Sequence, residues 1–159
     1  MDIMQEVAKF YYFQEKYDSA FYYYDKFEKI KKKNGLNMYP QENLKIGLVY
    51  DQMGFHDKAE DYYKAYAEYC ENDQSIYQSA SLAMKYLHDG KPSLAMEQFQ
   101  LFATKNNYQY WILLFLEEDP LIKSLKSHPD YDAVIQKIRD RFWENHNQLK
   151  LSLEDKDLI

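Results

Sequence analysis

The chain has little of what a sheet protein or an extracellular protein usually contains. Its 159 residues include three Val and one Thr, and because strands are enriched in β-branched residues, a mainly β fold is excluded. The single cysteine, Cys70, cannot form an internal disulfide, which fits a reducing compartment. Four Gly and four Pro are scattered along the chain, without a phosphate-binding loop or a dinucleotide fingerprint. These scarcities predict an all-α protein.

The charge balance and the apolar runs bear on possible partners. Acidic residues outnumber basic ones by 26 to 20, which argues against a nucleic-acid partner. Lysines gather within residues 26–33, at the expected end of a helix, where cations complement the helix dipole. The longest apolar run, Tyr110 to Leu116, is far shorter than the ~20 residues that span a bilayer. Residues 1–6 show no signal peptide, so we expect a soluble, cytoplasmic protein without a membrane partner.

The sequence contains no recognisable catalytic or metal-binding motif. No Gly-x-Ser-x-Gly motif is present, and Cys70 has no neighbouring base or cation that would activate its thiol. We interpret the acidic triplet Glu117–Asp119 as a partner of a helix N-terminus. The histidines lack the spacing of zinc ligands: they are His56, His88, His128 and His146. The sequence therefore predicts no enzyme, no metal and no cofactor.

The first two thirds of the chain contain an internal repeat. The alanines Ala20, Ala59 and Ala95 occupy equivalent places, 39 and 36 residues apart. A small residue and a tyrosine precede each turn, and an aromatic residue follows each alanine: Ala8, Tyr11 and Tyr24; Gly47, Tyr50 and Tyr63; Ala83, Tyr86 and Phe99. Small residues let two antiparallel helices approach closely, and the aromatic residues fill the space beside them. Each unit is therefore predicted to be a helix, a tight turn and a second helix.

At these positions the chain resembles the tetratricopeptide repeat (TPR) family, whose unit is about 34 residues long. The resemblance extends from Met4 to Thr104. The aromatic residue that usually opens the first helix of the unit is absent, and the closing proline is missing from the first two units. The best match is carried by Gly47, Tyr50, Gly54, Ala59 and Tyr63.

The resemblance implies three helix-pair repeats, at residues 1–35, 40–72 and 74–105, stacked as a right-handed superhelix. Between the first two, Gly35 is expected to end one helix and Pro40 to open the next.

Residues 106–159 depart from the repeat and are predicted to cap it within the same domain. The dipeptides Asp119-Pro120 and His128-Pro129 each predict the start of a helix, the second one long. The segment is also similar to the end of certain bacterial TPR arrays, which often lie behind a hydrolase or cyclase domain or in a larger regulator. Before it, a short apolar helix is expected to be buried: Tyr108, Trp111, Ile112, Leu114 and Phe115.

The first helix is expected to begin at Met1, with no earlier helix to cover it. It carries Tyr11, Tyr12 and Phe13 in succession, so aromatic side chains point in several directions around the helix. We expect an exposed apolar surface here, of the kind that marks an interface.

The leading hypothesis is a non-catalytic module that binds a peptide or partner domain through the repeat groove or through this N-terminal face. In TPR proteins the first helix of each unit lines the groove. The matching positions are Gln5, Lys9, Tyr12 and Phe13; Leu44, Leu48, Asp51 and Gln52; and Tyr77, Ala80, Met84, Leu87 and His88. This mixed, partly apolar lining favours an amphipathic helix or an extended segment as ligand.

Some TPR proteins clamp the C-terminal carboxylate of a chaperone with lysine and asparagine side chains. The equivalent positions here hold Gln5 and Lys9, then Lys45, then Tyr77 and Ser81. This departure argues against a chaperone clamp.

Two other functions stay open at this point. The chain is compatible with a regulatory or dimerising C-terminal tail of a larger bacterial enzyme or transcription regulator, and with a repeat used only for self-assembly. The partner could then be an upstream domain of the same chain or a second copy.

Overall fold

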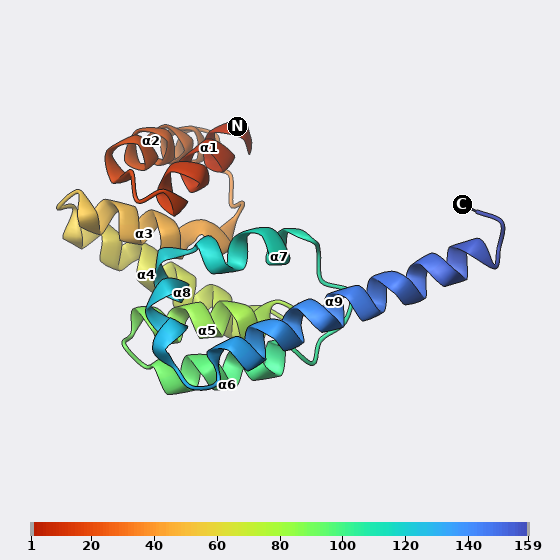
Figure 1. Ribbon diagram of the computed structural model, residues 1–159. Coiled ribbons are helices and arrows are strands. Elements are labelled where there is room, and N and C mark those ends of the chain that lie inside the picture. Colours follow the sequence, from red (N-terminus) through yellow and green to blue (C-terminus); the bar gives the residue numbers. More distant parts are fainter. Residues whose placement is uncertain (1, 159) are drawn as a thin grey trace. The chain divides into compact units, whose positions relative to one another are not determined.

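A computed structural model describes residues 2–158 (Figure 1). Over these residues the chain is all-helical, with nine α-helices and no strand, which confirms the predicted class. Met1, the expected first residue of the first helix, lies outside the described residues. The chain forms two compact units, Met1–Asp73 and Gln74–Ile159, called the first and the second unit below.

The first unit contains two antiparallel helix pairs. They are α1 (Asp2–Phe13) with α2 (Tyr17–Lys33), and α3 (Asn43–Gln52) with α4 (His56–Asn72); a 3-10 turn, η1 (Pro40–Glu42), precedes α3. As expected, Gly35 follows the end of α2 and Pro40 opens the next helical segment. The core between the pairs is largely aromatic and small: Ala8, Tyr12, Ala20, Tyr24, Phe27, Ile46, Val49, Tyr50 and Ala59.

The second unit contains the third helix pair and the C-terminal segment. Its elements are α5 (Gln78–His88), α6 (Pro92–Phe102), α7 (Trp111–Phe115), η2 (Leu116–Glu118), α8 (Pro120–Lys123), η3 (Ser124–Ser127) and α9 (Tyr131–Glu154). The pair α5 and α6 shares one core with α8 and the first half of α9. The C-terminal segment therefore packs against the third helix pair.

The predicted close approach of paired helices is clearest at Gly47 in α3. A Cβ atom built there would lie 2.6 Å from Cε1 of Tyr63 and 3.3 Å from the carbonyl oxygen of Ala59, both in α4. Real Cβ atoms do not come that close to other carbon atoms. The other small residues of the repeat frame are buried too: Ala8, Ala20, Ala59, Ala83 and Ala95.

The turn inside a repeat needs one residue with a left-handed backbone conformation, that is, with a positive φ. In the second repeat this residue is Gly54 (φ 81°), and the N–H of Phe55 donates to the carbonyl of Tyr50 at 2.9 Å. In the first repeat Glu15 takes the same place with φ 57°, and the N–H of Lys16 donates to the carbonyl of Tyr11 at 3.0 Å. A side chain with a Cβ atom is strained in this conformation, and glycine is not.

Replacing Glu15 with glycine is therefore expected to stabilise the protein by about 0.5–1 kcal/mol, because relief of the strain exceeds the added freedom of the unfolded chain. Gly54→Glu is the matched reverse change, since no atom lies within 4 Å of a Cβ at Gly54, and should cost about 1 kcal/mol. Urea denaturation measures both. A lower midpoint for Glu15→Gly would contradict the argument.

The second unit contains both predicted helix starts. Asp119 caps α8, since its Oδ1 accepts the N–H of Leu121 at 3.0 Å with Pro120 in the first turn. The long helix α9 begins at Tyr131, just after His128-Pro129.

The expectation that the short apolar helix is buried was wrong. Only Tyr108 and Ile112 of its predicted residues are buried. Trp111, Leu114 and Phe115 are each more than two-fifths exposed. A helix of five residues makes less than two turns, so a single side can face the core.

Candidate interaction surfaces

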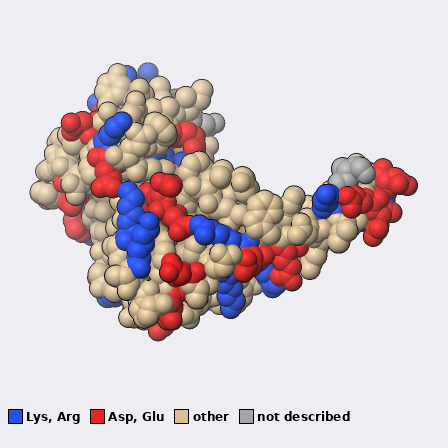
Figure 2. All heavy atoms as spheres, in the orientation of Figure 1, with Lys and Arg blue, Asp and Glu red and all other residues tan. Residues whose placement is uncertain are grey.

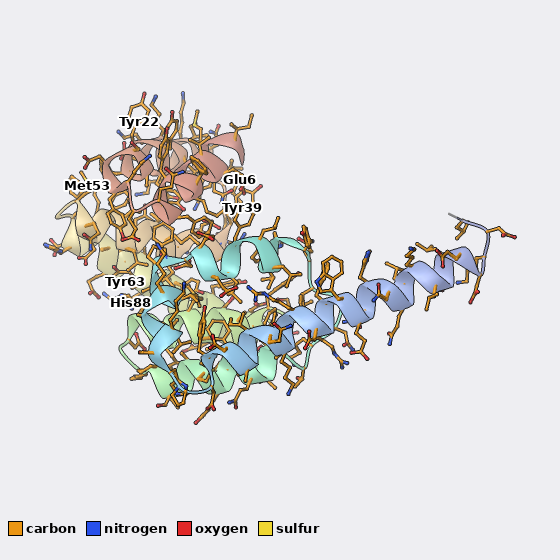
Figure 3. All side chains as sticks on the ribbon, viewed as in Figure 1. Glu6, Tyr22, Tyr39, Met53, Tyr63 and His88 are labelled. Carbon is orange, nitrogen blue, oxygen red and sulfur yellow. The ribbon has the colours of Figure 1, made fainter. Side chains whose placement is uncertain are left out.

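The first unit exposes a continuous row of aromatic rings across α1 and α2, here called the N-terminal aromatic strip: Phe10, Tyr11, Tyr23 and Tyr22. Ring centroids are 5.7 Å apart from Phe10 to Tyr11, 5.8 Å from Tyr11 to Tyr23, and 5.1 Å from Tyr23 to Tyr22. Phe10 is 59% exposed and Tyr22 53% exposed. Figure 3 shows Tyr22 on the outer side of α2. An apolar surface is therefore present at this end of the unit, but the residues expected to form it do so only in part, because Tyr12 is buried in the core and Phe13 is half-buried.

Ile3 and Lys26 extend the strip at its two ends. Ile3 lies two helical turns before Phe10, on the same side of α1, and is 78% exposed. The Nζ of Lys26 lies 4.0 Å from the ring centroid of Tyr22 and donates to its hydroxyl at 2.5 Å. The strip thus offers apolar area with a cation at one end.

The predicted groove residues of the first unit differ widely in exposure. Gln5, Tyr12 and Leu44 are buried, with Tyr12 only 1% exposed, so these three offer no free surface. Phe13 and Leu48 are half-buried against the core.

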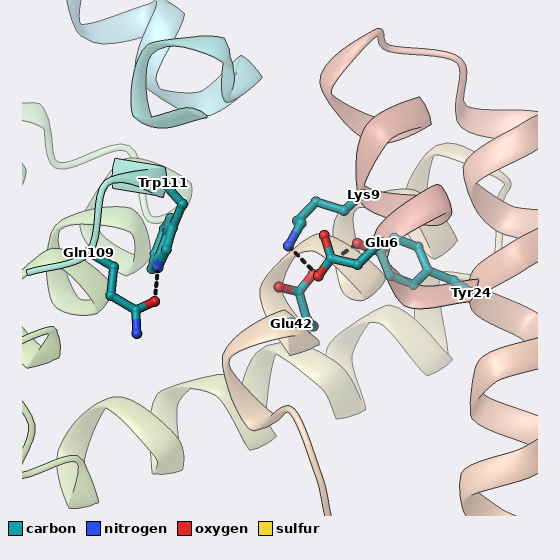
Figure 4. A network of polar contacts seen from close by, with 6 residues as sticks. All are labelled: Glu6, Lys9, Tyr24, Glu42, Gln109 and Trp111. Atoms are coloured by element: carbon teal, nitrogen blue, oxygen red, sulfur yellow. Dashed lines mark hydrogen bonds and ion pairs between the residues drawn. The ribbon is translucent and has the colours of Figure 1, made fainter. Parts of the chain in front are cut away.

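The polar groove residues of this unit lie nearer to solvent. Lys9 pairs with Glu6 at 2.9 Å on α1 (Figure 4), and Asp51 contacts Nδ1 of His56 at 2.6 Å. Gln52 is exposed and lines a shallow depression beside the turn that contains Glu15.

In the second unit the predicted groove residues mostly face the unit's own C-terminal segment. The hydroxyl of Tyr77 accepts the N–H of Gln109 at 2.9 Å, and its ring stacks on that of Trp111 at 5.7 Å. Leu87 is buried, Met84 and Ala80 pack partly on the same core, and His88 lies 3.5 Å from Asp89. The groove positions that were matched to those of TPR proteins did not predict these contacts, because the pattern of one helix does not show which segment covers it.

A buried network of tyrosines and carboxylates closes the interior of the first unit, and the sequence analysis missed it. The hydroxyl of Tyr24 donates to Glu42 at 3.1 Å (Figure 4), and that of Tyr62 to Glu28 at 3.0 Å. Glu28 also pairs with Lys31 at 2.8 Å. Burial, followed by the charge of Glu28, raises the pKa of Tyr62 far above its ordinary value. The network thus gives each buried acid a hydroxyl donor. Among the described residues, the second carboxylate oxygen of Glu28 has no hydrogen-bond donor and has only the ion pair with Lys31.

A second group of exposed rings lies where α9 passes the segment before α7, here called the α9 aromatic cluster: Tyr110, Phe142, Trp143 and His146. The ring of Tyr110 lies 5.5 Å from Phe142 and 6.2 Å from Trp143, and Trp143 lies 5.4 Å from His146. Tyr110 and Trp143 are each about half exposed.

Comparison with known proteins identifies no relative: no protein family, curated protein or solved structure matches this chain. Within residues 2–158, His, Cys, Asp and Glu do not come together in any group that could hold a metal ion. None of the described helices has both the length and the apolar character needed to cross a membrane.

Proposed function

We propose that this chain is a TPR-like helical-repeat protein that acts as a non-catalytic protein-interaction module. The proposal is supported by three helix pairs that share one frame of small residue, tyrosine, turn, alanine and aromatic residue. It is also supported by the aromatic side chains that the units leave in solvent, because interfaces are enriched in such residues.

The observation that carries the proposal is the N-terminal aromatic strip. Exposed Tyr and Phe side chains in contact with one another provide large apolar area at low cost in side-chain entropy, which is typical of binding hot spots. Lys26 at one end adds a charged hydrogen-bond donor. We therefore propose a partner segment with a run of apolar side chains and a carboxylate at one end, such as an amphipathic helix.

Phe10→Glu is expected to abolish partner binding while leaving the melting temperature unchanged, because Phe10 contributes exposed rather than core area. The matched control is Leu101→Glu, which places the same charge at an apolar side chain of similar exposure in α6 of the second unit. Capture from cell extract, compared across the wild type and both variants, measures the effect.

Specific proteins retained by the wild type and by Leu101→Glu but lost by Phe10→Glu support the proposal. Equal retention by all three proteins would contradict it.

A further inference from the structure

The last helix, α9, is longer than its own unit can cover. In its first half Tyr131, Val134, Ile135 and Ile138 are buried in the core of the second unit. Between Trp143 and Leu158, only Asn145 and Leu153 are partly shielded. Figure 1 shows this C-terminal half extending away from the other helices of its unit.

The uncovered half continues the apolar side of the covered half. The stripe starts at Phe142, which is half-buried against the core of the second unit. His146, Leu149 and Leu153 follow it at spacings of four, three and four residues, so these side chains lie on one side of the helix, in line with Ile135 and Ile138. Leu149 is 61% exposed.

Backbone hydrogen bonds close the C-terminal end of α9. The N–H of Leu158 donates to the carbonyl of Leu153 at 3.0 Å, with Asp157 in the left-handed region. This type of helix end brings the two leucines together. The free half of α9 therefore begins beside the α9 aromatic cluster, to which it contributes Trp143 and His146, and carries aliphatic side chains at its other end.

We propose that the free half of α9 is a homodimer interface, in which a second copy of this chain pairs with it antiparallel. Placing the two-fold axis beside residues 147 and 148 sets Phe142 against Leu153 of the partner subunit and His146 against Leu149 of the partner subunit. Each aromatic cluster then receives the aliphatic end of the other copy. A single patch is used twice, as a two-fold interface requires.

The charges of α9 favour a second copy in this orientation. Residues 137–141 carry two net positive charges, and residues 154–157 carry two net negative charges. Figure 2 shows the acidic side chains gathered at the free end of the helix. Antiparallel pairing places the segment of net positive charge beside the partner's segment of net negative charge, with opposite helix dipoles, whereas parallel pairing places segments of like net charge together. The same helix therefore carries both the positive and the negative segment that the antiparallel pairing brings together.

The interface is short. The stripe from Phe142 to Leu153 covers roughly 16 Å of helix. Two helices in contact over this length bury less surface area than a standard stable interface does. We therefore expect a dimer that dissociates on dilution. This interface does not depend on the N-terminal aromatic strip, so either proposal can fail without the other.

The first test is sedimentation equilibrium of the full chain over a dilution series, with Leu149→Glu and Leu151→Glu. Leu151 is the matched control because it is 60% exposed on the opposite side of the same helix. We expect dimers for the wild type and Leu151→Glu, and a dissociation constant raised about 100-fold or more for Leu149→Glu, because each interface buries that residue twice. Unchanged circular dichroism establishes that the variants are folded. A wild type that stays monomeric throughout, or equal effects of both variants, would overturn the proposal.

The second test is oxidative cross-linking, which reports the orientation. In the antiparallel pair the two copies of residue 149 are offset by about 5 Å along the axis and those of residue 153 by about 16 Å. Leu149→Cys should therefore form a covalent dimer and Leu153→Cys should not, since a disulfide needs close Cα atoms. The wild type serves as control because Cys70 is buried. Cross-linking of both variants, or of neither, overturns the antiparallel arrangement.

Discussion

Replacement of Gly47 by leucine is expected to destabilise the first unit by about 3 kcal/mol or more. The site has no room even for a Cβ atom, because the ring of Tyr63 would lie 2.6 Å away and the backbone of Ala59 3.3 Å away. The ring can rotate aside, but the carbonyl belongs to α4, so a large side chain forces α3 and α4 apart. That separation exposes the core around Val49 and Tyr50.

Two spectroscopic signals show which unit the Gly47→Leu substitution destabilises. Both tryptophans, Trp111 and Trp143, belong to the second unit, so their fluorescence follows that unit, whereas far-ultraviolet circular dichroism follows all helices. In urea, Gly47→Leu should lose helical signal before the tryptophan signal changes. Wild-type midpoints for both signals would show that α3 and α4 are not in close contact at this glycine.

Gly47→Ala provides the matched control. Alanine favours a helix over glycine by about 1 kcal/mol, and displacement of the Tyr63 ring opposes that gain, so we expect a small net change. In a Tyr63→Ala background the ring is gone, and the same change should stabilise the protein by up to about 1 kcal/mol. The double-mutant cycle thus isolates the ring contact from the backbone contact.

The sequence was sufficient to predict the helix pairs because their determinants are local. Gly47 and Gly54 follow from the spacing of small residues and from turn chemistry, and both lie as the repeat frame implies. Asp119-Pro120 is a capping signal complete in two residues. The backbone conformation of Glu15 could not be predicted from the local sequence. Its φ is positive, and a glutamate at this position gives no sign of a left-handed backbone.

The surfaces could not be predicted in the same way. Three aromatic residues follow one another at the end of α1, and the pattern alone does not show that Tyr12 enters the core while Tyr11 and Phe13 stay partly outside. The start of α9 was predicted from His128-Pro129, but whether a neighbour covers the apolar side of this helix depends on segments distant in sequence. Burial by distant segments also decides the roles of Tyr77 and Leu87, which pack within their own unit.

Raising the pH above about 10 is expected to unfold the protein over a narrow range, because folded and unfolded tyrosines ionise differently. Burial raises the pKa of several tyrosines, among them Tyr50, Tyr62, Tyr63, Tyr108 and Tyr131. Neighbouring carboxylates raise the pKa of these residues further, except for Tyr108, whose pKa reaches about 12.

Proton linkage gives the direction in which the stability of the fold changes with pH. Below pH 10 these tyrosines are neutral in both states, and their contribution to stability is complete. Above pH 10 the unfolded chain releases protons that the folded chain retains, so each buried tyrosine removes up to about 1.4 kcal/mol of stability per pH unit until its folded pKa is reached. Partial exposure of Tyr62 and Tyr63 reduces their share. The part of the tyrosinate absorbance that comes from the buried tyrosines should therefore rise together with the loss of helix, as a step on top of the absorbance of the solvent-exposed tyrosines.

Tyr62→Phe separates this linkage from general alkaline damage. At pH 8 the variant should be less stable by about 1–2 kcal/mol, because Glu28 is buried and loses the hydroxyl that donates to it. Phenylalanine has no proton to release, so the stability of the variant should fall less steeply above pH 10, and the gap between the two proteins should close as the pH rises. Urea unfolding at pH 8, 10 and 11 measures the gap. A gap that stays constant or widens would mean that Tyr62 ionises in the folded protein, and that the network around Glu28 is open to solvent.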